Sequence, residues 1–180
     1  DWFEELERTG QRENYNVSVS GGGDNHSIFF SASYLEDEGY VRRTGFDRLT
    51  SRLNADFDIT DRFSVGGSTN LALTEIRGPS SAGTGSIVNP FGFAQGIGSI
   101  YPVFVNDQQG NIVRDVGGNP VWDNGEGFSE FNIGSRPIAQ GRHAIQELTL
   151  NREQDQDNTY GFRIFGEYEI LDGLKAKVLY

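Results

Sequence analysis

The sequence predicts an all-β protein with about six antiparallel strands that follow one another in chain order. Apolar and polar residues alternate in several segments, which is the pattern of strands with one apolar and one polar face. Short stretches rich in Gly, Asp and Asn separate some of these segments, as in hairpins. The composition agrees, because the 180 residues include 24 Gly and 12% aromatic residues but only 36% hydrophobic residues.

The clearest strand covers residues 13–21, ENYNVSVSG. Tyr15, Val17 and Val19 alternate there with Asn and Ser, so the two kinds of residue point to opposite faces. A Gly-rich turn over residues 21–25 is expected to lead into the next strand. The other predicted strands cover residues 27–35, 46–59, 63–74, 160–170 and 174–180.

The connections between the strands alternate in length. Tight turns at 21–26, 60–62 and 171–173 alternate with long connections at 36–45 and 75–157. In a meander all the short turns then fall at one end of the sheet, which is typical of outer-membrane barrels with short periplasmic turns and long extracellular loops. The sequence therefore predicts part of a large antiparallel up-and-down transmembrane β-barrel with one long extracellular loop insertion. Its apolar face is expected to meet outer-membrane lipid and its polar face the lumen.

This pattern divides the chain into four parts. Residues 1–12 are a lead-in from an extracellular loop with one or two helical turns, and 13–75 are four barrel strands. Residues 76–157 are the long extracellular loop, and 158–180 are two further barrel strands. Because the chain opens without Met and stops within a strand pattern, it is expected to be a fragment of a longer protein.

The long loop has its own predicted elements. A short helix is expected to open at Pro90, with Asn89 as its N-cap. The other expectations are a flexible segment at 78–86, a small hairpin at 101–121, an extended stretch at 143–150 and a mobile polar tip at 151–158.

Composition and motifs exclude several classes of function. The net charge of −11 argues against nucleic acid as a partner, since phosphate binding needs clustered Lys and Arg. The absence of Cys excludes disulfides and thiolate zinc sites, and His26 and His143 have no spaced partners. Oxygen ligands at 107–111 and 155–157 could hold calcium, but Asx-type turns are favoured. The sequence thus predicts no catalytic residues, no metal, no cofactor and no enzyme activity.

A series of segments along the chain has a recognisable order and spacing. These segments are DWFEELERTGQRENYNVSVSGG (1–22), FFSASYLEDEGYV (29–41), residues 46–75, NPF (89–91), IYPVF (100–104), DQQGN (107–111), RPIAQ (136–140) and FGEYEILDGLKAKVLY (165–180). Taken in order, they resemble SusC/RagA-like TonB-dependent outer-membrane transporters of Bacteroidota. Two residues depart from the family pattern, Asp37 where Gln is common and Arg136 where Asn is common.

The resemblance implies a function as well as a fold. Such proteins enclose a plug in a barrel of roughly 22 strands in the outer membrane of Gram-negative cells. It implies that the parent protein imports oligosaccharides or peptides, driven by TonB through a part of the chain that is not present here. It also implies a SusD-like surface lipoprotein as a partner that closes the barrel.

Aromatic residues are the candidate functional side chains. Loop aromatics can stack on sugars or grip a peptide or the lid lipoprotein, but they can also pack the loop's own small core, and both interpretations stay open. The loop candidates are Phe91, Phe93, Tyr101, Trp122, Phe128 and Phe131. Near the strand ends, the residues that suit an interface girdle are Phe57, Phe63, Tyr168 and Tyr180.

A second function class fits the same composition. A soluble, secreted β-sandwich that acts as a carbohydrate-binding or adhesin module would also be Gly-rich and acidic, with exposed aromatics. Such a module should close on its own strands and unfold cooperatively without detergent, whereas a barrel fragment would leave its sheet edges open.

Overall fold

The computed structural model describes residues 1–78, 89–150 and 153–180 and divides the chain into two compact units. The sheet unit comprises residues 11–38, 46–76 and 155–180, and the loop unit comprises residues 1–10, 39–45 and 77–154. Each unit is assembled from separate stretches of the chain, so each is described by itself.

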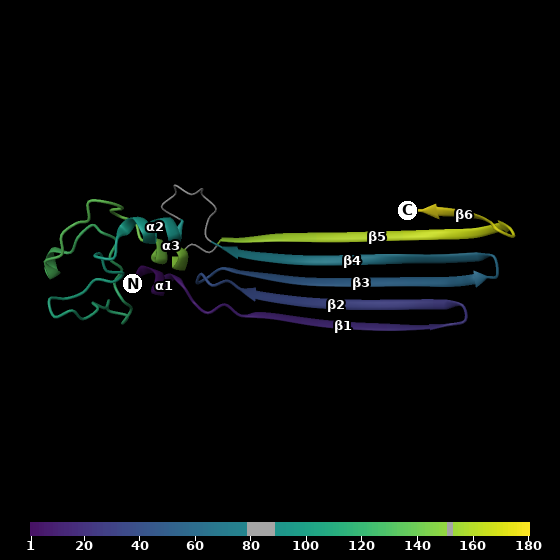
Figure 1. Ribbon diagram of the computed structural model, residues 1–180, viewed down its shortest axis with the longest axis horizontal. Coiled ribbons are helices and arrows are strands. Elements are labelled where there is room, and N and C mark those ends of the chain that lie inside the picture. The colour runs from purple at the N-terminus through teal and green to yellow at the C-terminus, as the bar shows by residue number, and fades with distance from the viewer. Residues whose placement is uncertain (79–88, 151–152) are drawn as a thin grey trace. The chain divides into compact units, whose positions relative to one another are not determined.

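The sheet unit is one open, all-antiparallel sheet in the order β1-β2-β3-β4-β5-β6 (Figure 1). This confirms the predicted all-β meander, although the six strands do not close into a barrel. The three tight turns β1–β2, β3–β4 and β5–β6 lie at the same end of the sheet. The strands are β1 Arg12–Gly23, β2 His26–Glu38, β3 Gly45–Thr60, β4 Phe63–Gly78, β5 Glu153–Leu171 and β6 Leu174–Leu179.

The predicted turn at 21–25 is too long. Only Asp24 and Asn25 form the turn, because the three preceding glycines continue β1. Gly21, Gly22 and Gly23 pair with Ile28, Ser27 and His26. Gly carries no side chain, so apolar alternation stops at residue 19 while the backbone ladder continues.

The predicted mobile tip at 151–158 is also wrong for the part that the structure describes. Strand β5 already begins at Glu153, and its first eight residues are all exposed. Polar residues on both faces of an exposed strand leave no alternation to detect. Residues 151–152 of this prediction lie outside the described residues. The same is true of the flexible segment predicted at 78–86, except for Gly78, which is the last residue of β4.

In the described part of the loop unit, the helical elements are three short helices and a 3₁₀ turn: α1 Trp2–Leu6, α2 Pro90–Ile97, η1 Ser129–Phe131 and α3 Ala144–Leu150. The helical turns expected in the lead-in are confirmed by α1. Helix α2 begins as predicted, because Oδ1 of Asn89 accepts hydrogen bonds from the backbone N–H groups of Phe91 and Gly92, both at 3.1 Å. Among the described residues, no helix has the length and apolar character to cross a membrane.

The extended stretch predicted at 143–150 is wrong, because α3 occupies it. Ala144, Ile145 and Leu148 follow helical spacing and are all buried, with exposed fractions of 8% or less. Their spacing was the sequence signal for a helix, and burial of that face stabilises a helix that is too short to be stable alone.

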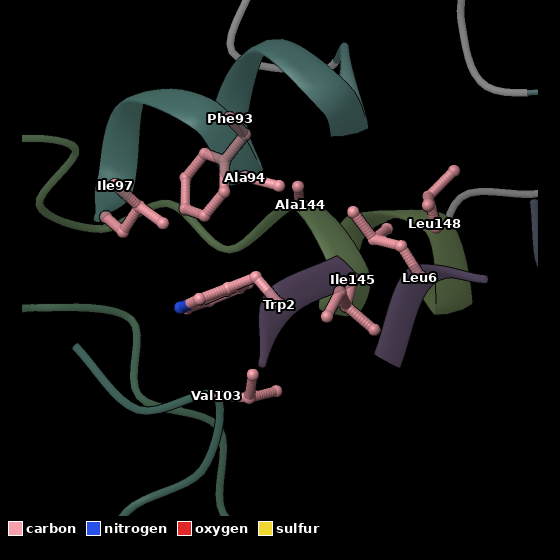
Figure 2. Close-up of a cluster of buried hydrophobic side chains, with 9 residues drawn as sticks. All are labelled: Trp2, Leu6, Phe93, Ala94, Ile97, Val103, Ala144, Ile145 and Leu148. Carbon is pink, nitrogen blue, oxygen red and sulfur yellow. The ribbon is translucent and has the colours of Figure 1, made fainter. Parts of the chain in front are cut away.

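Every buried hydrophobic residue of the described chain lies in the loop unit. Most of them come from the three helices and meet in one cluster (Figure 2). Trp2 joins α1 to the chain around residue 101, since its Nε1–H donates to the carbonyl of Tyr101 at 2.7 Å. The cluster consists of Trp2, Leu6, Phe93, Ala94, Ile97, Val103, Ala144, Ile145 and Leu148.

Candidate functional site

The apolar face of the sheet is continuous from β1 to β2. Residues that pair directly across an antiparallel ladder point to the same face. Val17 pairs with Ala32 and Val19 pairs with Phe30, so the register places apolar residues beside apolar residues. Val17 is 56% exposed and Val19 is 62% exposed. This face therefore has a matched apolar surface that the described protein does not cover.

The other face carries ion pairs. In the β5–β6 ladder Glu167 pairs with Lys177 and Glu169 pairs with Lys175. The carboxylate of Glu167 contacts both cations, with Lys175 Nζ at 3.1 Å and Lys177 Nζ at 3.6 Å. Gly166 and Tyr168 pair with Val178 and Ala176 on the opposite face. Between residues 166 and 169, strand β5 therefore separates apolar from charged side chains, as β1 separates apolar from polar ones.

The strand-end aromatics lie at the surface of the sheet. The rings of Phe63 and Tyr168 lie 6.4 Å apart, and the ring of Phe57 stacks on His26 at 6.3 Å. Tyr180 is 92% exposed. Their assignment to an interface girdle stays a prediction.

The six loop aromatics differ in their surroundings. Phe93 is buried at 5% exposure and packs edge-on against Trp2, with centroids 5.2 Å apart. Phe91 is half-buried beside Phe3, at 6.4 Å between centroids. Trp122 packs against the core beside Phe104 at 4.8 Å.

The remaining three candidates are half-buried. Tyr101 packs against the core, while Phe128 forms an isolated bridge with Ile133 and Phe131 ends η1. Core packing therefore involves at least Phe93, Trp122 and Tyr101, and a contact of the six with substrate or lid stays a prediction.

The loop unit also contains an eight-residue repeat that the sequence interpretation missed. Val105, Val113 and Val121 are linked in a closed ring of backbone hydrogen bonds. Val113 N donates to Val105 O at 2.8 Å, Val121 N to Val113 O at 3.0 Å, and Val105 N to Val121 O at 2.9 Å. The segment expected to be one hairpin, 101–121, thus contains two turns around a common centre.

Each turn of the repeat is closed by an Asp and an Asn four residues later. Oδ1 of Asp107 accepts from the backbone N–H groups of Gln109 at 2.9 Å and Asn111 at 2.8 Å, and Asp115 does the same with Gly117 and Asn119. Hydrogen bonds favour the ionised carboxylates. The side-chain amide and then the backbone N–H of Asn111 lower the pKa of Asp107, and the backbone N–H and then the amide of Asn119 lower the pKa of Asp115. The spacing D-x-x-G-N, which occurs at 107–111 and again at 115–119, was the sequence signal.

The carboxylate of Asp107 is thus used for turn closure, in agreement with the Asx-type turn that the sequence favoured over calcium. The second candidate, 155–157, lies within β5. Among the described residues, no three side chains of His, Asp or Glu are grouped to hold a metal ion.

His143 and Arg136 are the most buried polar residues of the loop unit, each 1% exposed. Nε2 of His143 lies 2.8 Å from the carbonyl of Val103, and Nδ1 accepts from the N–H of Gln146 at 3.2 Å. These two bonds require the neutral tautomer with hydrogen on Nε2. Burial lowers the pKa of His143, and the guanidinium of Arg136 lowers it further.

Arg136 ties together the end of the loop. Its Nη2 donates to the carbonyls of Ala139 at 3.3 Å and Arg142 at 2.9 Å, while its guanidinium lies 5.9 Å from the ring centroid of Phe93. In the described structure Nε and Nη1 of Arg136 have no hydrogen-bond partner. Gly125 lies against this guanidinium with φ of 77°, where a Cβ would overlap it.

These features define an open, all-antiparallel sheet with one uncovered apolar face and a separately packed loop. No protein-family model matches the chain. The chain is similar to three receptors of Formosa agariphila. TonB-dependent receptor P3 is 27% identical over 187 residues, which cover 100% of this chain and 16% of that protein. TonB-dependent receptor P39 is 31% identical over 61 residues, which cover 34% of this chain and 6% of that protein.

The third relative, TonB-dependent receptor P26, is 26% identical over 126 residues, or 69% of this chain and 12% of that protein. The chain spans only a small part of the length of these relatives. The similarities support the TonB-dependent receptor family, whose members are outer-membrane proteins. They also agree with the expectation that the chain is not an enzyme.

Proposed function

We propose that the chain is part of the barrel wall of a TonB-dependent outer-membrane transporter of the SusC/RagA type. The parent protein imports oligosaccharides or peptides, is driven by TonB, and works with a SusD-like surface lipoprotein. The similarity to TonB-dependent receptors supports the receptor class, and the sequence segments that resemble SusC/RagA proteins support the subtype.

The main support for a membrane location is the distribution of buried and exposed apolar residues. Among the described residues, all buried hydrophobic side chains are in the loop unit, while the sheet leaves apolar residues such as Val17, Val19 and Tyr168 at least half exposed. In water an exposed apolar surface of this extent favours aggregation. Contact with lipid removes the surface from water without a second layer of protein. The backbone groups inside the sheet are paired, as a membrane crossing requires.

The connections give the sheet a direction. Two residues separate β1 from β2, β3 from β4 and β5 from β6, whereas the loop unit is built largely from the connection between β4 and β5. Short turns on the periplasmic side and long loops outside are the rule for such barrels. We therefore assign the turn at Asp24–Asn25 to the periplasm and the loop unit to the cell exterior.

The loop unit is the proposed contact region for substrate or lid lipoprotein. Its half-buried aromatics Phe91, Tyr101 and Trp122, with Phe128 and Phe131, are the candidates that have partly accessible rings. Phe93 would contribute by supporting the core, since it is 5% exposed.

Cysteine labelling of the full-length protein in intact cells tests the direction. Gln109→Cys, at an exposed tip of the eight-residue repeat, should react with a membrane-impermeant maleimide added outside. Asn25→Cys should react only after the outer membrane is opened. Equal labelling of both positions in intact cells, or labelling of Asn25→Cys alone, would refute the assignment.

A soluble β-sandwich is tested with the same protein. Recovery of the protein from the aqueous fraction, with cooperative unfolding in the absence of detergent, would favour the sandwich. Recovery in the outer-membrane fraction, with uptake that stops when TonB is deleted, is the expected result.

A further inference from the structure

The polar face of the sheet contains a hollow of about 340 Å³ that no role assigned above uses. Strands β3, β4, β5 and β6 all contribute to it, and all its residues belong to the sheet unit. The lining includes the polar residues Arg52, Asn54, Asp56, Ser68, Arg163 and Lys177.

The hollow forms over β4 because the residues of that strand that line it have small side chains or none. Strand β4 contributes only Gly67 and Ser68, so the longer side chains of β3, β5 and β6 form the walls. The neighbouring Gly66 also lacks a side chain, and the ring of Phe165 lies in the space above it. The ring is held there by the sheet and by Lys177, whose Nζ lies 3.8 Å from the ring centroid.

The charge of the lining is opposite to that of the chain. Arg52, Arg163 and Lys177 are basic and only Asp56 is acidic, whereas the whole chain has a net charge of −11. Although the whole chain is acidic, this local excess of positive charge produces a positive potential at the hollow, which attracts anions at short range.

Two of the three cations are free to bind. Arg52 donates only to the amide oxygen of Asn54, at 3.3 Å, and within the described chain neither Arg52 nor Arg163 forms an ion pair. Both side chains are exposed on the polar face. Lys177 is shared with Glu167 at 3.6 Å and therefore adds less charge.

We propose that this hollow binds an anionic oligosaccharide during its passage, with a carboxylate or sulfate group held by Arg52 and Arg163. The inference rests on the proposed function, since it needs the polar face to line the lumen. Guanidinium groups present paired donors that match the oxygens of both anions. Asn54 and Ser68 offer amide and hydroxyl groups for sugar hydroxyls, which favours a saccharide over an acidic peptide.

The test uses full-length protein in detergent and measures binding of three probes by calorimetry. A sulfated dextran octasaccharide and tetragalacturonate carry the two anions, and uncharged dextran octasaccharide is the neutral probe. We expect the anionic probes to bind more tightly than the neutral probe, with an affinity that falls as salt rises. Arg52→Gln combined with Arg163→Gln should weaken anionic binding about tenfold or more, because the anion loses its charge-assisted hydrogen bonds to both guanidinium groups.

Lys175→Gln is the matched control, because Lys175 is a cation on the same face that is not part of the lining and is bound to Glu167. It should leave binding of the anionic probes unchanged. Equal affinity for charged and neutral probes, no effect of the double variant, or an equal effect of Lys175→Gln would overturn the proposal. Equally tight, Arg52-dependent binding of a poly-Glu peptide would overturn the choice of a saccharide.

Cysteine variants separate this proposal from the proposed function. In membranes, Ser68→Cys should react with an aqueous reagent and be protected by the sulfated probe, while Val65→Cys on the apolar face should not react. Reactivity at Val65→Cys instead of Ser68→Cys would refute the lumen assignment itself. A reactive Ser68→Cys that the probe does not protect, or that crosslinks to another segment of the same protein, would refute only the binding site.

Discussion

The ring of Phe165 on β5 occupies the space above Gly66 on β4, where a Cβ would lie 2.5 Å from Cζ of the ring. The same Cβ would also overlap the carboxylate of Asp56 on β3. Phe165 is an apolar residue on the polar face of the sheet, and this contact explains its place. An aromatic ring that covers a glycine on a neighbouring strand compensates for the side chain that the glycine lacks.

A methyl group at residue 66 should therefore destabilise the sheet. Gly66→Ala forces the Phe165 ring or the strand to shift, at a cost of about 1–3 kcal/mol. Thermal unfolding of the full-length protein, followed by the change in gel mobility that accompanies barrel unfolding, measures the effect. Gly21→Ala is the control, since a Cβ there has no atom within 4 Å. Equal midpoints for the two variants would contradict this account of the contact.

Trp2 is expected to hold α1 to the loop unit. Trp2→Ala removes the hydrogen bond to the carbonyl of Tyr101 and the ring contact with Phe93, at a cost of about 3–5 kcal/mol for a buried Trp. Limited proteolysis of the full-length protein should then cut within residues 90–150 at a much higher rate. Ile100→Ala, at a position that is 83% exposed, should leave the rate unchanged. Unchanged cleavage of the Trp2 variant would show that α1 is dispensable.

The loop unit should lose stability in mild acid because His143 is buried in its neutral form. Its pKa is lowered from the ordinary value of 6.5, so below about pH 6.5 the unfolded chain binds more protons than the folded one. Stability is therefore full above pH 6.5 and falls with decreasing pH until the folded pKa is passed, by at most about 1.4 kcal/mol per pH unit. The groups that face the imidazole are Arg136, which opposes its charging, and Asp123, which favours it.

Proteolysis rates between pH 4.5 and 7.5 measure this dependence. The variant His143→Gln should be less stable at pH 7.5, since it loses ring contacts with Trp2 and Trp122. It should also show a flatter profile between pH 6.5 and 4.5. An unchanged pH profile in the variant would assign the dependence to other groups.

The guanidinium of Arg136 is expected to require a glycine at residue 125. Gly125→Ala places a Cβ against that guanidinium and puts a non-glycine residue at φ of 77°, which together should cost about 1–3 kcal/mol. Gly134→Ala meets nothing within 4 Å and is the matched control. The ratio of their proteolysis rates within residues 90–150 gives the measurement. Equal rates would mean that Arg136 moves aside without cost.

The sheet could be predicted from the sequence because apolar and polar residues alternate within most of its strands. Tyr15, Val17 and Val19 identify their face without reference to any other strand. Gly21–Gly23 and 153–157 could not be assigned in this way, since glycines and all-polar stretches pair through the backbone and leave no pattern of side chains. Helix α3 differs from these two cases, because the helical spacing of Ala144, Ile145 and Leu148 is visible in the sequence and was missed.

The loop aromatics show what tertiary packing decides. Phe93 and Trp122 look equally suited to bind a ligand in the sequence, yet Phe93 is buried against Trp2 while Trp122 is half-buried beside Phe104. The positively charged hollow was not predicted from the sequence either, because Arg52 and Arg163 line it together only through the pairing of β3, β4 and β5. The repeated D-x-x-G-N spacing, in contrast, was readable from the sequence.

The most direct test of the central account compares an arginine on each face of β1. Val17→Arg puts a charge on the apolar face, and Ser18→Arg puts the same charge on the polar face one residue away. We predict that Val17→Arg lowers the free energy of unfolding of the full-length protein in lipid vesicles by about 2–4 kcal/mol and so destabilises it. Ser18→Arg should change that free energy by less than about 1 kcal/mol. Equal effects of the two substitutions, or a larger effect of Ser18→Arg, would contradict the assignment of the apolar face to lipid.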